Sequence, residues 1–244
     1  MRHPGPEKVV GILGGMGPEA TVDLMQRIIR LTSAKDDIDH IRCLVDNNPK
    51  IPSRIKALIE GNGESPGPCM AGMAKNLESW GADFIVIPCN TAHYYHPEVQ
   101  KAVQVPVLNI IELVVAACLR HTPGLRKAGL LASPAVRLTG LYERVFAQHQ
   151  VEVVYPAPAQ EELLLGAIRQ VKAGDNGSGP RTVMASTAEH LAGRGAELAI
   201  IACTELSAIA DAPFSIPQID AAEVLAEAVV AYAKNQLGRP PAPQ

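Results

Sequence analysis

The chain has 244 residues, a net charge of −3 and 47% hydrophobic residues, which is enough to build a packed core in one domain or in two small ones. Acidic and basic residues are mixed along the chain without a basic stripe, so we expect no nucleic-acid partner. No apolar run is long enough to span a bilayer, and the N-terminal residues lead into a strand rather than a signal peptide, so we expect a cytoplasmic protein without a membrane partner.

Short apolar runs alternate along the chain with segments whose apolar residues recur at helical spacing. The predicted strands are residues 9–13, 41–45, 84–88, 107–110, 127–132, 152–155 and 198–202. The predicted helices are residues 19–31, 51–60, 70–80, 111–120, 138–148, 161–172, 181–194 and 221–236. Gly-rich and Pro-rich segments at 61–68 and 174–180 are predicted to be flexible loops. This alternation of strands and helices predicts an α/β fold with parallel sheets.

The two halves of the chain repeat the same order of elements. The letters GIL at 11–13 are followed by PCNT at 88–91, and GLL at 129–131 are followed by ACTE at 202–205. We therefore predict two similar doubly wound parallel-sheet domains, related by pseudo-two-fold symmetry, with the active site in the cleft between them. We assign residues 1–106 and 214–244 to the first domain, to which the C-terminal helix returns, and residues 107–213 to the second.

The chain has five cysteines without a CxxC pair or a Cys/His cluster, so we expect free thiols and no metal site. They are Cys43, Cys69, Cys89, Cys118 and Cys203. A cysteine taken singly is usually a small buried hydrophobe, which is our interpretation of Cys43, Cys69 and Cys118. Cys89 and Cys203 differ, because each follows a predicted strand in matching Cys-polar-polar turns, and catalytic groups gather at the carboxyl ends of parallel strands.

Two thiols that approach a ligand from opposite sides suit a two-base proton transfer, in which one takes the Cα proton and the other supplies a proton to the opposite face. A free thiol has a pKa of about 8.5, and a helix N-terminus lowers it. Thr91 and Thr204 lie where such helices are predicted to begin. The backbone N–H groups of Asn90, Thr91, Thr204 and Glu205 would also form nests for a carboxylate.

Four motifs carry a resemblance to a known family: GILGGMGPEAT at 11–21, NNPKIPSR at 47–54, PCNTAH at 88–93 and ACTEL at 202–206. Through them the chain resembles the aspartate/glutamate racemase family, specifically its aspartate racemase branch, from about residue 9 to about residue 232. The resemblance implies two α/β domains with an interdomain active site, neither PLP nor another cofactor, no metal, and a homodimer. The function it implies is cofactor-independent racemisation of an acidic amino acid, aspartate first and glutamate second.

The resemblance also implies roles for individual residues. It makes Cys89 and Cys203 the catalytic acid and base. Asn90, Thr91 and Thr204 match positions that hold the substrate α-carboxylate.

Two basic residues have a second interpretation each. Arg54 suits a bidentate pair with a substrate carboxylate, a role that the family supports, although without its motif it would be a surface arginine. Lys172 matches a family lysine near the active site, but a lysine at the end of a helix also suits the helix dipole.

Four other residues are candidates for the surroundings of the thiols. Met16 belongs to the floor of the pocket or to a simple strand-to-helix turn. His93 and Glu205 assist the chemistry, or they only pack and cap their helices. Ser133 begins a departure from the family, because residues 133–136 are SPAV where a Thr-x-Gly-Thr turn is common. The pocket wall there is therefore more apolar and stiffer, which leaves the substrate side chain open.

Other functions compete with an amino acid racemase. A hydantoin racemase usually lacks the GGMGP opening, an arylmalonate decarboxylase needs only one cysteine, and a maleate isomerase is a third enzyme of the same superfamily. A non-catalytic amino-acid-binding protein would need only the N–H nests and Arg54, not both sulfurs. A PLP enzyme would need a Schiff-base lysine and a phosphate cup, and we find no convincing set.

Overall fold

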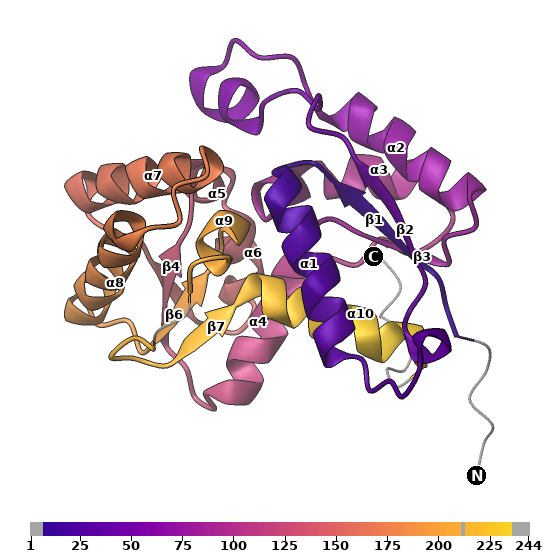
Figure 1. Ribbon diagram of the computed structural model, residues 1–244. Coiled ribbons are helices and arrows are strands. Elements are labelled where there is room, and N and C mark those ends of the chain that lie inside the picture. The colour runs from indigo at the N-terminus through magenta and orange to yellow at the C-terminus, as the bar shows by residue number, and fades with distance from the viewer. Residues whose placement is uncertain (1–6, 211–212, 236–244) are drawn as a thin grey trace.

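The structure, a computed structural model, describes residues 7–210 and 213–235 and places two parallel sheets in two lobes (Figure 1). The first sheet has the strand order β2-β1-β3 and the second has the order β5-β4-β6-β7. The strands are β1 (Val10–Gly14), β2 (Cys43–Asn47), β3 (Phe84–Val86), β4 (Lys127–Leu131), β5 (Glu152–Val154), β6 (Leu198–Ile201) and β7 (Gln218–Asp220). The predicted α/β fold with two parallel-sheet domains is confirmed.

Helices cover both sheets. They are α1 (Pro18–Leu31), α2 (Gly67–Ser79), α3 (His96–Ala102), α4 (Ile110–His121), α5 (Pro134–Thr139), α6 (Leu141–Ala147), α7 (Pro158–Lys172), α8 (Ser178–Gly193), α9 (Thr204–Ser207) and α10 (Ala221–Ala233). Three short segments are η1 (Asp37–Asp39) and η3 (Thr91–Tyr95), which are 3₁₀ helices, and η2 (Lys56–Glu60), a π-helix. None of the helices described is both long and apolar enough to cross a membrane.

The two sheets share one central core. On β1, Val10 and Ile12 face this core, which also contains Leu130 of β4 and buried residues of α1, α4 and α10. On its other side each sheet has a core of its own. Leu13 packs with residues of α2 in the first lobe, and Leu131 packs with residues of α7 and α8 in the second. Each fully buried aliphatic side chain contributes about 1.5–3 kcal/mol to the stability of the fold. Because side chains of both lobes contribute to the same core, this core joins the two lobes.

The strands next to the cleft run in the same direction within each sheet. Val10 of β1 is in register with Phe84 of β3, and Ala128 of β4 is in register with Leu198 of β6. In a parallel sheet the carboxyl ends of all strands lie on the same side of the sheet. The turns that follow β3 and β6 are therefore at the carboxyl ends of the strands, where the catalytic groups of doubly wound folds collect.

Two predicted elements are wrong. The predicted strand at 107–110 is a single bridge between Val107 and Ile85, and α4 begins at Ile110 because the Asn109 side chain accepts a hydrogen bond from the backbone N–H of Ile111 at 3.0 Å. The predicted helix at 138–148 is two helices, α5 and α6. They are divided at Gly140, whose φ of 60° lies in the left-handed region.

Three predicted segments change their extent. The helix expected over 51–60 is helical only over residues 54–60, of which 56–60 form the π-helix η2. The loops expected at 61–68 and 174–180 end earlier, because α2 begins at Gly67 and α8 begins at Ser178.

The C-terminal part of the described chain contacts both lobes. Strand β7, which the sequence did not predict, pairs with β6 in the second sheet, although we assigned residues 214–244 to the first domain. Helix α10 then lies beside α1 and also packs against α4 (Figure 1). The division into 1–106 with 214–244 and 107–213 stays a prediction, and its residues 1–6, 211–212 and 236–244 lie outside the described residues.

Gly15 is required by the turn between β1 and α1. Its φ is +96°, and a Cβ there would lie 2.3 Å from backbone atoms of Asn48. We expect Gly15→Ala to lower the free energy of unfolding by about 2–4 kcal/mol, because backbone strain adds to the clash. Urea denaturation measures this change.

The matched control is Gly72→Ala in α2, because a Cβ at Gly72 would meet no atom within 4 Å. This variant should be more stable than wild type by about 1 kcal/mol. Equal stability of the two alanine variants would contradict the assignment of Gly15 to a position that only glycine accepts.

Candidate functional site

A cavity of about 70 Å³ lies at the carboxyl ends of β3 and β6, with walls from both lobes. All ten residues predicted for the site line it: Met16, Arg54, Cys89, Asn90, Thr91, Ser133, Lys172, Cys203, Thr204 and Glu205. Six further residues that the sequence analysis did not select also line it: Ser53, Ile55, Leu165, Ile168, Arg169 and Ala202. The structure therefore gathers in one place residues that are as much as 189 positions apart, from Met16 to Glu205.

Both candidate thiols lie in turns that follow strands, Cys89 after β3 and Cys203 after β6. Cys89 follows β3 in a turn in which its N–H donates to the carbonyl of Ile87 at 2.8 Å. Cys203 follows β6, and its turn is anchored by the N–H of Ala202, which donates to the carbonyl of Leu131 at 2.9 Å. Each cysteine is only 8% exposed. Backbone hydrogen bonds thus fix the two turns, and both cysteines are largely buried.

His93 fixes the turn of Cys89 through the backbone. Its Nδ1 lies 2.8 Å from the carbonyl oxygen of Cys89, and its Nε2 accepts from the N–H of Ile110 at 3.2 Å, so Nδ1 carries the proton and donates. Burial lowers the pKa of His93 to about 3, so the ring stays neutral. Of its two predicted roles, the contacts support packing and positioning of the turn, since both ring nitrogens bind backbone.

Cys203 belongs to a chain of three ionisable groups. Its thiol donates to Glu205 Oε2 at 3.0 Å, and Lys172 Nζ lies 3.2 Å from Glu205 Oε1. Burial and the Glu205 carboxylate raise the pKa of Cys203 well above its usual range, and Lys172 opposes this rise. Burial lowers the pKa of Lys172, but Glu205 and the two cysteines raise it more, so the ammonium stays charged.

The expectation that a helix N-terminus lowers the pKa of both thiols is wrong for Cys203. Helix α9, which begins at Thr204, has only four residues, and η3, which begins at Thr91, is a single 3₁₀ segment of five. So short a helix has few aligned peptide dipoles. Burial and a neighbouring carboxylate outweigh them at Cys203.

The hydroxyl groups beside the thiols connect the lobes. Thr91 Oγ1 lies 3.2 Å from Ser133 Oγ, and Thr204 Oγ1 donates to the carbonyl of Pro88 at 3.4 Å. The wall that departs from the family pattern is the first turn of α5, with Pro134 at its N-terminus. Met16 is 2% exposed and packs in the core of the first lobe where it borders the cavity.

Positive charge exceeds negative charge around the cavity. Arg54, Arg169 and Lys172 line it, against a single carboxylate, that of Glu205. Arg54 Nη1 donates to the carbonyl of Pro52 at 3.1 Å, which leaves other donors of the guanidinium for a ligand. The sequence analysis missed Arg169, although it precedes Lys172 by three positions on α7 and so shares its helix face.

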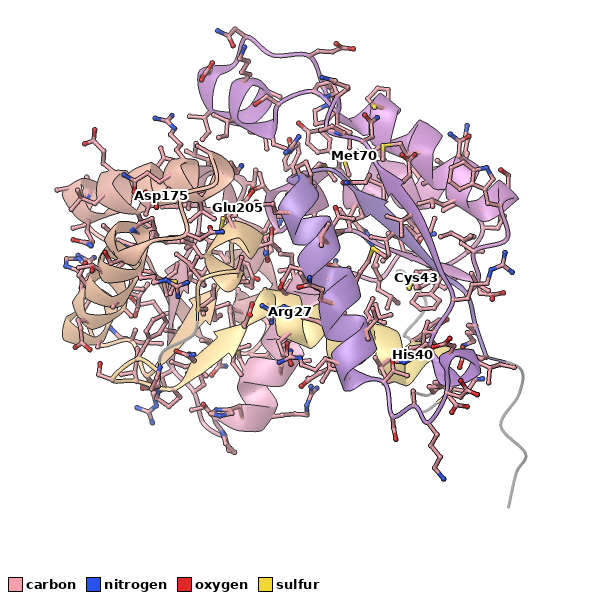
Figure 2. The ribbon with its side chains drawn as sticks, viewed as in Figure 1. Arg27, His40, Cys43, Met70, Asp175 and Glu205 are labelled. Carbon is pink, nitrogen blue, oxygen red and sulfur yellow. The ribbon has the colours of Figure 1, made fainter. Side chains whose placement is uncertain are left out.

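An ionic network that includes Arg27 of α1 connects α9 of the second lobe to the first lobe. Arg27 of α1 donates to the carbonyl of Ser207 at 3.1 Å and pairs with Asp220 at 2.9 Å and Glu223 at 2.7 Å. Ser207 Oγ donates to Asp220 Oδ1 at 2.5 Å. Figure 2 shows Arg27 on α1 beside α10, and Glu205 on α9 in the second lobe. The network thus ties the helix that carries Glu205 to both α1 and α10.

The cavity has little to offer a metal ion. Within residues 7–210 and 213–235, no three His, Cys, Asp or Glu side chains are placed together to ligate one. All five cysteines are free thiols. The cavity thus places two thiols beside a positively charged wall, and thiols are groups that can accept and donate protons.

Comparison with known proteins identifies the family of this chain. The family model described as Asp/Glu/Hydantoin racemase matches residues 13–229. The chain therefore belongs to the Asp/Glu/hydantoin racemase family, as its motifs predicted, and is an isomerase of that family.

Individual relatives are similar over most of the chain. The broad specificity amino-acid racemase RacX of Bacillus subtilis is 31% identical, covering 91% of this chain and 96% of that protein. The structure of Picrophilus torridus aspartate racemase is 32% identical with a TM-score of 0.82, covering 93% of this chain and 94% of that one. An aspartate racemase homologue from Pyrococcus horikoshii is 25% identical with a TM-score of 0.71, covering 93% and 99%.

The two neighbours of Cys203 should change its reactivity in opposite directions. Glu205→Gln removes a carboxylate that raises the pKa of Cys203, so more thiolate forms at pH 8 and alkylation by iodoacetamide becomes faster, by about tenfold. Lys172→Met removes a cation that lowers this pKa, so alkylation becomes slower. Peptide mass spectrometry over time measures the rate at each cysteine.

Cys118 serves as the internal reference, because it is buried and does not line the cavity. Its alkylation rate should be the same in wild type and both variants. A common rise at Cys118 and Cys203 would point to local unfolding instead of a change in pKa.

Proposed function

We propose that this protein racemises an acidic amino acid, aspartate first and glutamate second, without a cofactor, by proton transfer at Cys89 and Cys203. The observation that carries the proposal is that two buried thiols from different lobes line one cavity with a positively charged wall. The family membership supports racemisation. The thiol mechanism and the acidic substrate rest on the site itself.

For one enantiomer one thiol acts as the base and the other as the acid, and for the other enantiomer the roles exchange. Cys203 donates to Glu205, and burial together with this carboxylate raises its pKa, which suits it to the role of acid. Cys89, as thiolate, takes the Cα proton, and Cys203 delivers its proton to the opposite face of the carbanion. No electrons are transferred. The Cys203 thiolate left behind lies near the Lys172 ammonium, which favours the charged sulfur.

The positive wall supports a substrate with two carboxylates. The Glu205 carboxylate offsets the Lys172 ammonium, which leaves the guanidinium groups of Arg54 and Arg169 for two substrate carboxylates. Neutralising the α-carboxylate is essential, since it would otherwise repel the negative charge that develops at Cα. RacX has a broad specificity by name and the Picrophilus enzyme is named for aspartate, so the choice of an acidic substrate rests on these charges.

Two further predictions from the sequence belong to the proposal. A homodimer and a cytoplasmic location stay predictions, because they rest on the resemblance and on the composition of the chain. A hydantoin racemase, a maleate isomerase, an arylmalonate decarboxylase and a non-catalytic amino-acid-binding protein are the alternatives that the following experiment separates.

Each of the two proposed catalytic thiols should be necessary for racemisation. In D₂O without PLP or added metal, we expect L-aspartate to lose its Cα proton signal in NMR and to yield the D-enantiomer by chiral chromatography. Cys89→Ser and Cys203→Ser should each lower the rate by about 10²–10⁴-fold, the usual contribution of a catalytic acid or base. Cys69→Ser is the matched control, because Cys69 does not line the cavity.

Full activity in either single cavity variant would reject the two-thiol mechanism. Exchange with a hydantoin but with neither acidic amino acid would favour the hydantoin racemase. Binding of aspartate without any exchange would favour a binding protein.

Arg169 should select for the acidic substrate. Arg169→Met removes a cation from the cavity wall, so KM for aspartate should rise about fivefold, a modest factor because the side chain is exposed. KM for alanine, where accepted, should change less, because alanine has no side-chain carboxylate. Arg194→Met, on an exposed arginine outside the cavity wall, is the control. Equal effects on both amino acids would remove Arg169 from substrate selection.

A further inference from the structure

A buried hydrogen bond joins the two lobes beside the cavity. The hydroxyl of Tyr142, on α6 of the second lobe, donates to Oδ1 of Asn90 at 2.7 Å. Asn90 belongs to the turn of Cys89 in the first lobe. Tyr142 is 0% exposed and Asn90 is 2% exposed. Water therefore does not compete for this contact.

The amide nitrogen of Asn90 has no partner. Nδ2 is buried and forms no hydrogen bond with the residues that the structure describes, while Asn90 lines the cavity. Buried donors are normally paired, because an unpaired one loses its bonds to water without replacement. A ligand in the cavity with an acceptor oxygen would satisfy this donor.

Because Oδ1 of Asn90 accepts from Tyr142, the NH₂ group is the end of the amide left for a ligand in the cavity that Asn90 lines. A flip of the Asn90 side chain would leave the Tyr142 hydroxyl hydrogen without its acceptor and would turn Oδ1 toward the ligand. An oxygen there would repel a carboxylate, whereas the NH₂ group binds one. With a carboxylate bound, the observed orientation pairs the Tyr142 hydroxyl with Oδ1 and the NH₂ group with a substrate oxygen. The flipped orientation would leave the hydroxyl hydrogen without an acceptor and would place Oδ1 against the substrate oxygen.

We propose that Tyr142 is a positioning residue that holds the Asn90 amide with its NH₂ group toward the cavity, ready to bind a carboxylate of the amino acid substrate. The proposal rests on the proposed function, which supplies the carboxylate. Tyr142 touches no reacting atom and acts only through Asn90.

Two features keep Tyr142 suited to this task. Burial raises the pKa of Tyr142 well above its usual range, so the hydroxyl keeps its proton at neutral pH and can donate. Its ring stacks on Phe146 of the same helix, with centroids 6.3 Å apart. The hydroxyl therefore has a fixed direction, which a surface tyrosine would lack.

The first test is Tyr142→Phe, which removes the hydroxyl and keeps the ring. We expect KM for aspartate to rise about tenfold with a smaller change in kcat, because the amide is then free to present oxygen to the substrate. Tyr155→Phe is the matched control, since Tyr155 is another largely buried tyrosine of the second lobe that does not line the cavity. It should keep the wild-type KM.

A double-mutant cycle separates positioning from a general structural role. If Tyr142 acts through Asn90, then Tyr142→Phe will raise KM in the wild-type background and will have no further effect in Asn90→Ala. Multiplicative effects of the two substitutions would overturn the proposal. Thermal unfolding of each variant shows whether it is folded at the assay temperature.

A second measurement does not depend on the fold of Tyr142→Phe. In ¹⁵N-labelled wild type, the Asn90 side-chain NH₂ signals, assigned through their loss in Asn90→Asp, should shift on titration with aspartate. No shift at saturating aspartate would overturn the proposal. Absence of racemisation by wild type and by Tyr155→Phe alike would reject the proposed function, whereas normal racemisation with an unchanged KM in Tyr142→Phe would reject only the role of Tyr142.

Discussion

The parallel order of the strands is the constraint on which the site depends. Because all strands of each sheet run the same way, the turns after β3 and β6 emerge at the edges that border one cavity, and each turn contributes a cysteine. Two sulfurs can act on one small molecule only if the lobes keep a fixed separation. The shared core around α4 and α10 and the Arg27 network provide that connection.

A second constraint acts within the cavity, where the two similar halves become chemically unequal. The turn after Cys203 contains Glu205, which accepts from the thiol and pairs with Lys172, whereas the corresponding turn after Cys89 contains Thr91, which contacts Ser133 across the cleft. A carboxylate in contact with one sulfur disfavours its thiolate. The surroundings of the two thiols therefore differ, although each thiol follows a strand of its own parallel sheet.

The similarity to named racemases supports racemisation as the reaction. It does not identify the side chain of the substrate, which depends on the residues of the cavity wall. Proteins at 31% and 32% identity have names that differ in breadth of specificity. In this chain the wall of the cavity combines a rigid first turn of α5 with the guanidinium groups of Arg54 and Arg169. In the proposed function, this wall selects the substrate by its charge more than by apolar shape.

The sequence by itself determined the alternation of strands and helices and the two sheets, because hydrophobic periodicity is a local pattern. The Cys-polar-polar turns and the family motifs pointed to ten of the sixteen residues that line the cavity. Only the tertiary structure decided the pairing of β7 with β6, since three residues carry too short a pattern to predict a strand. It alone revealed the contact of Tyr142 with Asn90 and the raised pKa of Cys203. Burial and distant neighbours produce these properties, and neither is encoded in the spacing of residues along the chain.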